Sequence, residues 1–412
     1  MSKAVTTALA FSCDRHTPPT NFAAAAAAAA QSGVVDELLI WDQMTNFWPR
    51  QLWHPDNTPM AAIVPDLDSY SDAFAMSGYL AAAVPGIGLT ISTDAIRRGP
   101  AELTQTMMTL ANMTEGRAKV MIGAGEAKQI TPYGWRRSEG LARLEDQLKG
   151  FHALWASTEP VDLPGNHWTF KQAWLGQSRT HRPHIWALGG GPKLFYLATT
   201  YADGISAIVP CVAPTPESWA HTVSTMKAEL ERKGRDPEQF EFGIWFMSLV
   251  HEDADLLERA LDNPLMRWMA GVFGRLDQSA WDAEGIEPPL PRDWHYAVKL
   301  LPVTWTESEI QGLLRRTTHE MAQKSFVYGT PESVAAQVEQ YVEAGATWVS
   351  VCDILPLLLD PVDAQAGLAR NIEICARLKK AEKHDRERNR RRRSERIPDL
   401  GQGGFTTPRR CT

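Results

Sequence analysis

Glu126 follows a short apolar segment that has the pattern of a buried strand. The segment covers residues 119–122, and Gly123 and Gly125 then allow a tight turn of the backbone. A carboxylate at the carboxyl end of a strand lies where α/β proteins place their chemistry. Glu126 is therefore the leading acid–base candidate. The alternative is that it solvates a loop or pairs with an arginine.

A glycine-rich turn is the second candidate site, with the sequence Gly189, Gly190, Gly191, Pro192 and Lys193. It lies between an expected strand and an expected helix. Free backbone amides at the start of a helix attract anions, and a lysine adds positive charge. The turn therefore suits a phosphate, although a glycine-rich turn alone is a weak signal.

Three polar residues follow the first two expected strands. Asp42 and Gln43 end the second strand, and His16 lies in the loop after the first. Gln43 is a candidate catalytic residue by its position, although an amide can form hydrogen bonds but cannot act as a base near neutral pH. His16 is a second acid–base candidate. The alternatives are a loop-capping role for Asp42 and a plain surface position for His16.

Aromatic side chains gather next to the second strand. Trp41, Phe47, Trp48 and Trp53 lie in or beside an irregular stretch that is rich in tryptophan and proline. Aromatic residues at the mouth of a site can form a pocket for an apolar substrate. Ordinary packing of a covering loop is the alternative.

Eight expected strands alternate with helices and must position these residues. This alternation predicts an α/β fold, a single (β/α)₈ TIM barrel, in which the carboxyl ends of all strands meet on one face. A doubly wound open sheet is the alternative. The expected strands cover residues 5–13, 37–42, 86–93, 119–123, 183–189, 204–209, 240–250 and 347–352.

The barrel is expected to occupy residues 1–380, with a closing helix over residues 357–380. Two long segments exceed the minimal plan, residues 43–68 and residues 251–324. Insertions of this size usually lie over the ligand, at the carboxyl-terminal face of the barrel. Residues 381–412 are expected to form a separate, disordered basic tail.

Composition excludes several classes of protein. The chain has 412 residues and a net charge of −7. Residues 376–412 contain 13 Lys and Arg against 5 Asp and Glu, so this tail carries +8 and the remainder −15. An acidic body of this kind disfavours nucleic acid as a partner. Five scattered cysteines indicate a reducing cytoplasm and neither disulfides nor a metal site, and no apolar run is long enough for a transmembrane segment.

Seven short motifs follow the order of the expected elements. They are Trp41-Asp42; Arg97-x-x-Pro100-Ala101; Gly123-Ala-Gly-Glu126 with Pro132-Tyr-Gly134; Leu141-Ala-Arg-Leu-Glu145; Gly190-Gly-Pro192 with Tyr201-Ala-Asp-Gly204; Gly234-Arg-Asp-Pro237; and Gly329-Thr-Pro-Glu332 with Glu343-Ala-Gly345. On these motifs the chain resembles the luciferase-like superfamily of (β/α)₈ barrels, in particular the members that use the deazaflavin coenzyme F420. The stretch from Asp42 to Arg50 is most similar to the ketoreductases of phthiodiolone lipids.

The resemblance implies roles for the polar residues. In the F420-dependent enzymes Asp42 would bond to the coenzyme, and the position of Gln43 usually carries a histidine that can move a proton. This chain departs from that pattern, so the proton-transfer role at this position is lost, moved or not needed, and Glu126 becomes the leading acid–base candidate. A glutamate next to a dry ring system would have its pKa raised by desolvation. The glycine turn would bind the phosphodiester of coenzyme F420 or the phosphate of FMN.

The resemblance also implies a non-proline cis peptide bond behind the ring of the coenzyme. In this sequence it would join Thr90 and Ile91, with Thr93 bonding the coenzyme. Such a bond costs about 3–4 kcal/mol and persists where function maintains it. Gln129 is a further expected polar contact.

The resulting hypothesis is a cytoplasmic F420-dependent oxidoreductase that transfers a hydride between the deazaflavin and a carbonyl or secondary alcohol of an apolar or lipid-like substrate. An FMN-dependent monooxygenase on the same barrel is the first alternative. A non-catalytic carrier of the cofactor is the second, and Gln43 motivates it. The resemblance also implies a homodimer.

Overall fold

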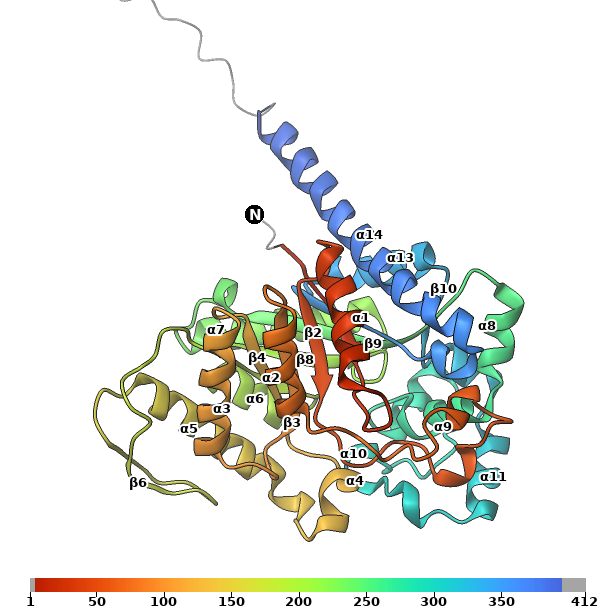
Figure 1. The fold of residues 1–412 in the computed structure, drawn as a ribbon, viewed down its shortest axis with the longest axis horizontal. Coiled ribbons are helices and arrows are strands. Elements are labelled where there is room, and N and C mark those ends of the chain that lie inside the picture. Colours follow the sequence, from red (N-terminus) through yellow and green to blue (C-terminus); the bar gives the residue numbers. More distant parts are fainter. Residues whose placement is uncertain (1–3, 395–412) are drawn as a thin grey trace, which may run out of the picture.

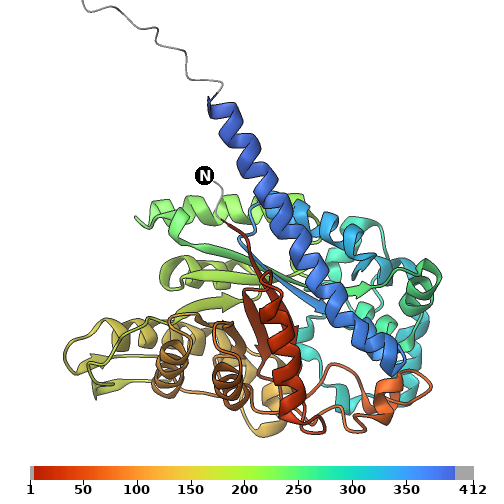
Figure 2. The ribbon, with the colours of Figure 1, turned by 45° about the horizontal axis from the view of Figure 1, so that its top comes forward.

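Eight parallel strands close into a barrel in the computed structural model, which describes residues 4–394 and the side chains of residues 4–381 (Figures 1 and 2). In chain order the barrel strands are β1 (Thr6–Phe11), β2 (Glu37–Trp41), β3 (Gly88–Asp94), β4 (Ala118–Gly123), β7 (His184–Leu188), β8 (Gly204–Val209), β9 (Glu241–Val250) and β11 (Trp348–Asp353).

Closure of the ring follows from the strand pairing. β1 lies between β2 and β11, and β9 pairs in parallel with both β8 and β11. None of the eight strands is therefore left with an open edge. The predicted (β/α)₈ barrel is confirmed, and the doubly wound open sheet is excluded.

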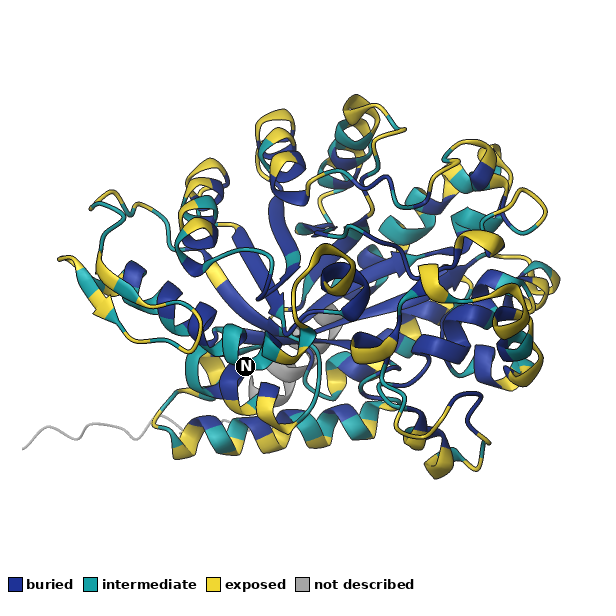
Figure 3. Ribbon diagram, turned by 90° about the horizontal axis from the view of Figure 1, so that it is seen from below, coloured by how far each residue is buried: buried dark blue, intermediate teal, exposed yellow. Residues whose placement is uncertain are grey.

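Helices follow the strands and cover the outside of the barrel. Figure 3 shows the strands buried at the centre and the helices exposed on their outer sides. In α1 the alanine run packs close to the barrel, since Ala26 and Ala29 are fully buried. The covering helices are α1 (Pro19–Gln31), α2 (Ala73–Ala83), α3 (Pro100–Met113), α5 (Gly140–Ala156), α6 (Pro192–Tyr201), α7 (Pro216–Arg232), α13 (Pro331–Glu343) and α14 (Pro361–Ser394). Most of them begin with proline, whose fixed φ suits the first helical position.

The two predicted insertions pack against each other. The indole of Trp48 donates to the carbonyl of Leu265 at 2.9 Å, and the indole of Trp268 donates to the carbonyl of Phe47 at 2.8 Å. In Figures 1 and 2 the loop after β2 lies beside the later insertion. That insertion contains α8 (Ala254–Leu261), α9 (Pro264–Phe273), α10 (Tyr296–Lys299), α11 (Glu307–Arg316) and α12 (His319–Gln323). The aromatic side chains of the loop therefore join two segments that are far apart in the chain.

Some elements differ from the sequence prediction. A hairpin of β5 (Val161–Leu163) and β6 (Phe170–Ala173) lies outside the barrel, and β10 (Val327–Gly329) extends the sheet beside the end of β9. These strands are three or four residues long. A periodic apolar pattern needs a longer window, so strands of this length leave little signal in a single sequence.

Helix α14 is longer than predicted. It was expected to end at residue 380, and it continues to Ser394, projecting beyond the barrel (Figure 2). The stretch after 380 is rich in Glu, Lys and Arg, which are good helix formers. The first part of the predicted tail is therefore helical. The prediction of disorder for residues 395–412 lies outside the described residues.

The interior of the barrel near the amino ends of the strands holds a buried charge cluster. Nζ of Lys119 lies 3.2 Å from the carboxylate of Glu37 and 4.0 Å from the ring centroid of Trp186. The hydroxyl of Thr90 donates to Glu37 at 2.5 Å, and the indole of Trp348 donates to it at 2.8 Å. Thr90 therefore belongs to this buried cluster near the amino ends of the strands.

The prediction of a cis peptide bond between Thr90 and Ile91 is wrong. Among the described residues the cis peptide bond is Val209–Pro210. Thr90 and Ile91 pair in regular register with β2 on one side and β4 on the other. An undistorted strand explains the trans bond, because both neighbours bond to it through this point.

None of the helices within residues 4–394 combines the length and the apolar character needed to cross a membrane.

Asp353, at the end of β11, is expected to make stability depend on pH. Its Oδ1 accepts from the amide of Leu355 at 3.1 Å, while its buried Oδ2 has no partner among the described residues. Burial raises the pKa of this carboxyl to about 7, against the opposing effect of the backbone amides. The folded protein thus keeps a proton that the unfolded chain has released. The free energy of unfolding should therefore fall as pH rises from about 4 to 7.

Asp353→Asn should remove this slope. At pH 8 the variant should be more stable than the wild type by about 4 kcal/mol, and at pH 4 the two should be alike. Urea unfolding at both pH values measures the difference. Parallel stability curves for the two proteins would show that the carboxyl is not buried in its protonated form.

Candidate active site

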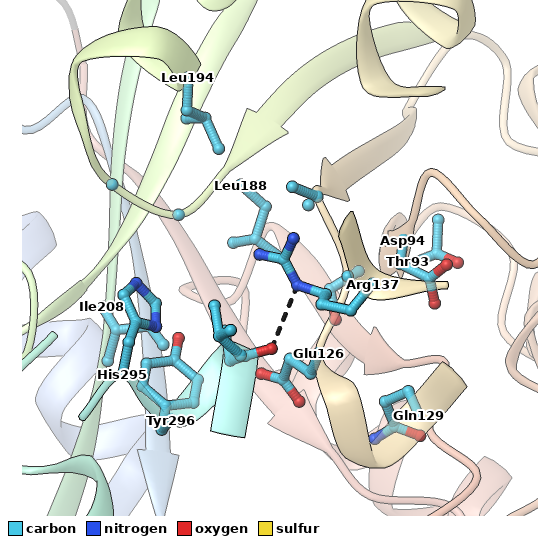
Figure 4. Close-up of a pocket in the computed structure, with 18 of the residues that line it drawn as sticks. Thr93, Asp94, Glu126, Gln129, Arg137, Leu188, Leu194, Ile208, His295 and Tyr296 are labelled. Atoms are coloured by element: carbon cyan, nitrogen blue, oxygen red, sulfur yellow. Dashed lines mark hydrogen bonds between the residues drawn. The ribbon is translucent and has the colours of Figure 1, made fainter. Parts of the chain in front are cut away.

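A cavity of about 370 Å³ opens at the carboxyl ends of the strands. The ends of β2, β3, β4 and β7 form one side, and residues 295–298 of the later insertion form the other. Figure 4 shows side chains from both sides pointing toward the same space. Asp42, Glu126 and Gly190, which were predicted separately, meet here.

Asp42 is held in a buried polar network. The hydroxyl of Thr93 donates to its Oδ2 at 2.7 Å, and Nη2 of Arg97 lies 3.1 Å from the same oxygen. Arg97 also pairs with Asp94, whose Oδ1 caps the turn after β3 by accepting from the amides of Ile96 and Arg97. Burial acts to lower the pKa of Arg97, but Asp94 and Asp42 outweigh it and raise the pKa. The guanidinium therefore stays charged and fixes both carboxylates.

Glu126 is placed by the glycine turn that the sequence indicated. Gly125 has φ of +90°, and a Cβ there would lie 3.0 Å from Ile130. Glu126 then becomes the N-cap residue of the short helix α4 (Ala127–Ile130) without capping it through its side chain. Its carboxylate is thereby left to face the cavity.

The surroundings of Glu126 differ from the expected dry pocket. Its Oε2 lies 3.1 Å from Nζ of Lys128, a side chain that is 1% exposed. The ammonium also donates to the carbonyl of Thr45 at 2.9 Å and lies 3.8 Å from the ring centroid of Phe47. Burial lowers the pKa of Lys128, and Glu126 acts in the opposite direction. The carboxylate is thus held by an ion pair.

Gln129 fixes the loop after β2. Its Oε1 accepts from the amide of Met44 at 2.6 Å and from that of Thr45 at 3.1 Å, and its Nε2 donates to the carbonyl of Thr45 at 3.0 Å. It lines the cavity, as predicted for a coenzyme contact, but most of its hydrogen-bonding capacity goes to the protein.

Gln43 lies between two cavities. It borders the cavity described above and a more polar one of about 470 Å³ that shares Asp42 and Arg97. Its Oε1 is buried and has no hydrogen-bond partner among residues 4–381. Buried polar atoms are normally satisfied. The amide is therefore placed to bond a ligand.

The glycine turn reaches the cavity with its first two residues. Gly189 and Gly190 line it, and a Cβ on Gly190 would lie 2.7 Å from Val212. Gly191 is the N-cap residue of α6 with φ of +101°, and Lys193 is exposed in its first turn. Gly191, Pro192 and Lys193 do not line the cavity and could contact only a ligand that extends out of it.

Several predicted site residues lie elsewhere. His16 is exposed in a turn closed by Asp14, which accepts from the amide of His16 at 2.8 Å. Thr90 is buried inside the barrel, and Ile91 is buried in the core between the barrel strands and the outer helices. None of the three lines the cavity, so the structure does not place them at the site.

The predicted aromatic substrate pocket is also absent from the cavity wall. Phe47 and Trp48 are buried between the loop and the insertion, Trp53 donates to the carbonyl of Val64 at 2.7 Å, and Trp41 packs on Trp245 with centroids 5.7 Å apart. The structure therefore favours the alternative, in which these aromatic side chains pack within a covering loop. The cavity wall instead takes its aromatic side chains from Trp245 and Tyr296.

Sequence reasoning missed three residues at this site. Arg137 lines the cavity, and its Nε donates to the carbonyl of Ala297 at 3.1 Å (Figure 4). His295 and Tyr296 come from the later insertion. The sequence showed only that this insertion is long, carries aromatic residues and would cover the site. It contained no motif that singled them out.

The fold and the site define a barrel enzyme with its cavity at the carboxyl ends of the strands. Residues 46–347 match the family model described as luciferase-like monooxygenase. Because this match covers most of the chain, the protein belongs to the luciferase-like monooxygenase family.

Among relatives, a phthiodiolone/phenolphthiodiolone dimycocerosates ketoreductase of Mycobacterium kansasii is 29% identical over 327 residues, which cover 77% of this chain and 86% of that protein. An F420-dependent glucose-6-phosphate dehydrogenase of Kineococcus radiotolerans is 26% identical over 265 residues, covering 63% and 70%. A solved F420-dependent secondary alcohol dehydrogenase, in complex with an F420-acetone adduct, superposes with a TM-score of 0.68 at 20% identity, covering 91% of this chain and 99% of that one. At this sequence identity, the similarity to the alcohol dehydrogenase shows only that the two proteins share a fold.

Proposed function

We propose that the protein is an F420-dependent oxidoreductase that transfers a hydride between the deazaflavin and a carbonyl or secondary alcohol of an apolar substrate. The observation that carries this proposal is the meeting of Asp42, Thr93 and Glu126 in one cavity, at the ends of three neighbouring strands. The names of the relatives support it, because they include a ketoreductase and an F420-dependent dehydrogenase.

The cavity fits a flat ring system. Its volume of about 370 Å³ lies within the range of ligand pockets. The unpartnered Oε1 of Gln43 is free to accept a hydrogen bond from a ring amide, and the small residues Gly189 and Gly190 leave room for close approach. Asp42 and Gln43 would hold the ring, and the amides at the start of α6, with Lys193, would hold its phosphodiester.

When bound, the deazaflavin accepts or supplies the hydride. The protein's part is orientation, exclusion of water and movement of a proton. Apolar side chains of Leu188, Ile208 and Trp245 line the cavity and would surround an apolar carbonyl compound. Glu126 takes part in the proton transfer that accompanies the hydride, because its carboxylate lies at the wall of the cavity where the substrate oxygen would be.

Titration of the purified protein with coenzyme F420 and with FMN, followed by fluorescence, separates this proposal from its main alternative. We expect tight binding of coenzyme F420, and a change in its absorbance when a panel of secondary alcohols is added. Tight binding of reduced FMN with substrate-dependent oxygen uptake would instead indicate a monooxygenase. Binding of coenzyme F420 without turnover on the whole panel would favour a non-catalytic carrier.

The homodimer implied by the family resemblance stays a prediction. Light scattering of the purified protein during size-exclusion chromatography tests it. The cytoplasmic location also stays a prediction, which fractionation of the source cells tests.

A further inference from the structure

The imidazole of His295 lies at the wall of the cavity. Its Nδ1 is buried without a side-chain hydrogen-bond partner among residues 4–381. The ring stacks on Tyr296 at a centroid distance of 5.6 Å, with 29° between the planes. His295 lines the cavity, so its other ring nitrogen, Nε2, is placed to bond a ligand there.

The backbone positions this side chain firmly. His295 is the N-cap residue of α10, and it pairs with Asp277 in an isolated antiparallel bridge. Its neighbour Tyr296 is buried and packs on Phe273 with centroids 4.4 Å apart. In Figure 4, His295 and Tyr296 lie on one side of Arg137, with Thr93 and Asp94 on the other. The insertion therefore presents the imidazole to the space that the barrel rim encloses from the opposite side.

We propose that His295 is the catalytic residue that exchanges a proton with the oxygen of the substrate. The proposal rests on the proposed function. Gln43 lines the same cavity, but its amide cannot act as a base. The structure places a histidine in the same cavity, on a different segment of the chain.

In the oxidation of a secondary alcohol, two bonds of the substrate break. The C–H bond at the carbinol carbon breaks, and its electron pair leaves with the hydrogen as a hydride for the deazaflavin. The O–H bond breaks, its electrons form the carbonyl π bond, and the proton goes to Nε2 of His295. Nε2 is the acceptor because Nδ1 is shielded. Reduction of a ketone reverses these changes.

The charges around His295 suit this role. Burial lowers the pKa of the imidazole, and the positive charge of Arg137 lowers it further. Asp277, the backbone of His295 itself and Glu126 act in the opposite direction. The ring is therefore neutral at pH 7 and ready to accept a proton. Glu126 faces it as the carboxylate that stabilises the imidazolium once the proton has moved. Lys128, in turn, keeps that carboxylate in place.

His295→Asn tests the proposal, with 2-octanol as the probe alcohol and His184→Asn as the control. His184 is exposed at the amino end of β7, away from the carboxyl ends of the strands. We expect His295→Asn to bind coenzyme F420 like the wild type and to oxidise 2-octanol at least about 100-fold more slowly. The wild-type rate should fall at a pH below the usual histidine range, where the imidazole becomes protonated. This limb should disappear in the variant, and added imidazole should restore part of the rate.

A second readout does not depend on turnover. The ring protons of His295 in the NMR spectrum, identified by their loss in His295→Asn, should titrate below the usual histidine range and should shift when 2-octanone is added to the coenzyme-loaded protein. Wild-type rates in His295→Asn at every pH, or ring protons that ignore 2-octanone, would overturn the proposal while leaving the proposed function intact. A wild-type protein that binds no deazaflavin would overturn both.

Discussion

Replacing Glu126 with Gln is expected to lower turnover by about 10²- to 10⁴-fold while the affinity for coenzyme F420 stays nearly unchanged. The amide has almost the same shape as the carboxylate, but it can neither take nor give a proton near neutral pH. The variant also removes the negative charge that faces His295. Coenzyme titration by fluorescence and steady-state rates on the probe alcohol measure the two quantities separately.

Glu145→Gln is the matched control for this variant. Glu145 lies on α5 and pairs with Lys149 four residues later, on the outside of the barrel. The control should keep wild-type rates, because a partly exposed ion pair of this type contributes little. Unaltered turnover in Glu126→Gln would remove Glu126 from the mechanism. A loss of coenzyme affinity of the same size as the loss of rate would make it a binding residue instead.

The barrel could be predicted because its signals are local and repeated. Each strand is a short apolar run, and each covering helix has clear stop or start residues, such as Gly33 after α1 and Pro100 at the start of α3. Strand order then follows from chain order, since parallel strands need helical crossovers. Asp42, Glu126 and the glycine turn could be assigned to one face for the same reason.

The contacts made by those residues could not be predicted in the same way. Lys128 is two positions after Glu126, and the sequence reads as a charged loop at that point. Its burial follows from Phe47 and the carbonyl of Thr45, which reach it from a loop more than 80 residues earlier. Single-sequence patterns report local periodicity, whereas this ion pair depends on packing between distant segments.

The residues that the insertion contributes to the site could not be predicted from the sequence, for a related reason. Its length and its tryptophan content showed that it would cover the site, but His295 and Tyr296 stand at the start of α10, a helix of four residues that is too short to leave a periodic pattern in the sequence. The aromatic loop after β2 was predicted to form a substrate pocket, and that prediction rested on composition alone. Its residues have the composition of a binding pocket, yet the hydrogen bonds of Trp48 and Phe47 connect the loop to the insertion.

Arg97 is expected to be the residue of the site on which folding depends most. Its side chain is 8% exposed and contacts two buried carboxylates, those of Asp94 and Asp42. Arg97→Met would keep most of the apolar volume and remove the positive charge, so Asp94 would remain buried without its ion-pair partner and Asp42 would keep only the longer contact with Arg98, at 3.7 Å. Removing one partner of a buried ion pair costs about 3–5 kcal/mol. Urea unfolding should show a fall of this size in the free energy of unfolding.

The neighbouring arginine provides the comparison. Arg98 is 32% exposed; it bonds to Asp72 near the surface at 2.7 Å and lies 3.7 Å from Asp42, so Arg98→Met should cost about 1 kcal/mol or less. Adding Asp94→Asn to Arg97→Met should recover part of the loss, because it removes the buried charge that has lost its ion-pair partner. If the two single arginine variants were equally stable, the carboxylate of Asp42 would not depend on Arg97. The hydroxyl of Thr93 and the guanidinium of Arg98 would then be enough to hold Asp42 at the mouth of the cavity.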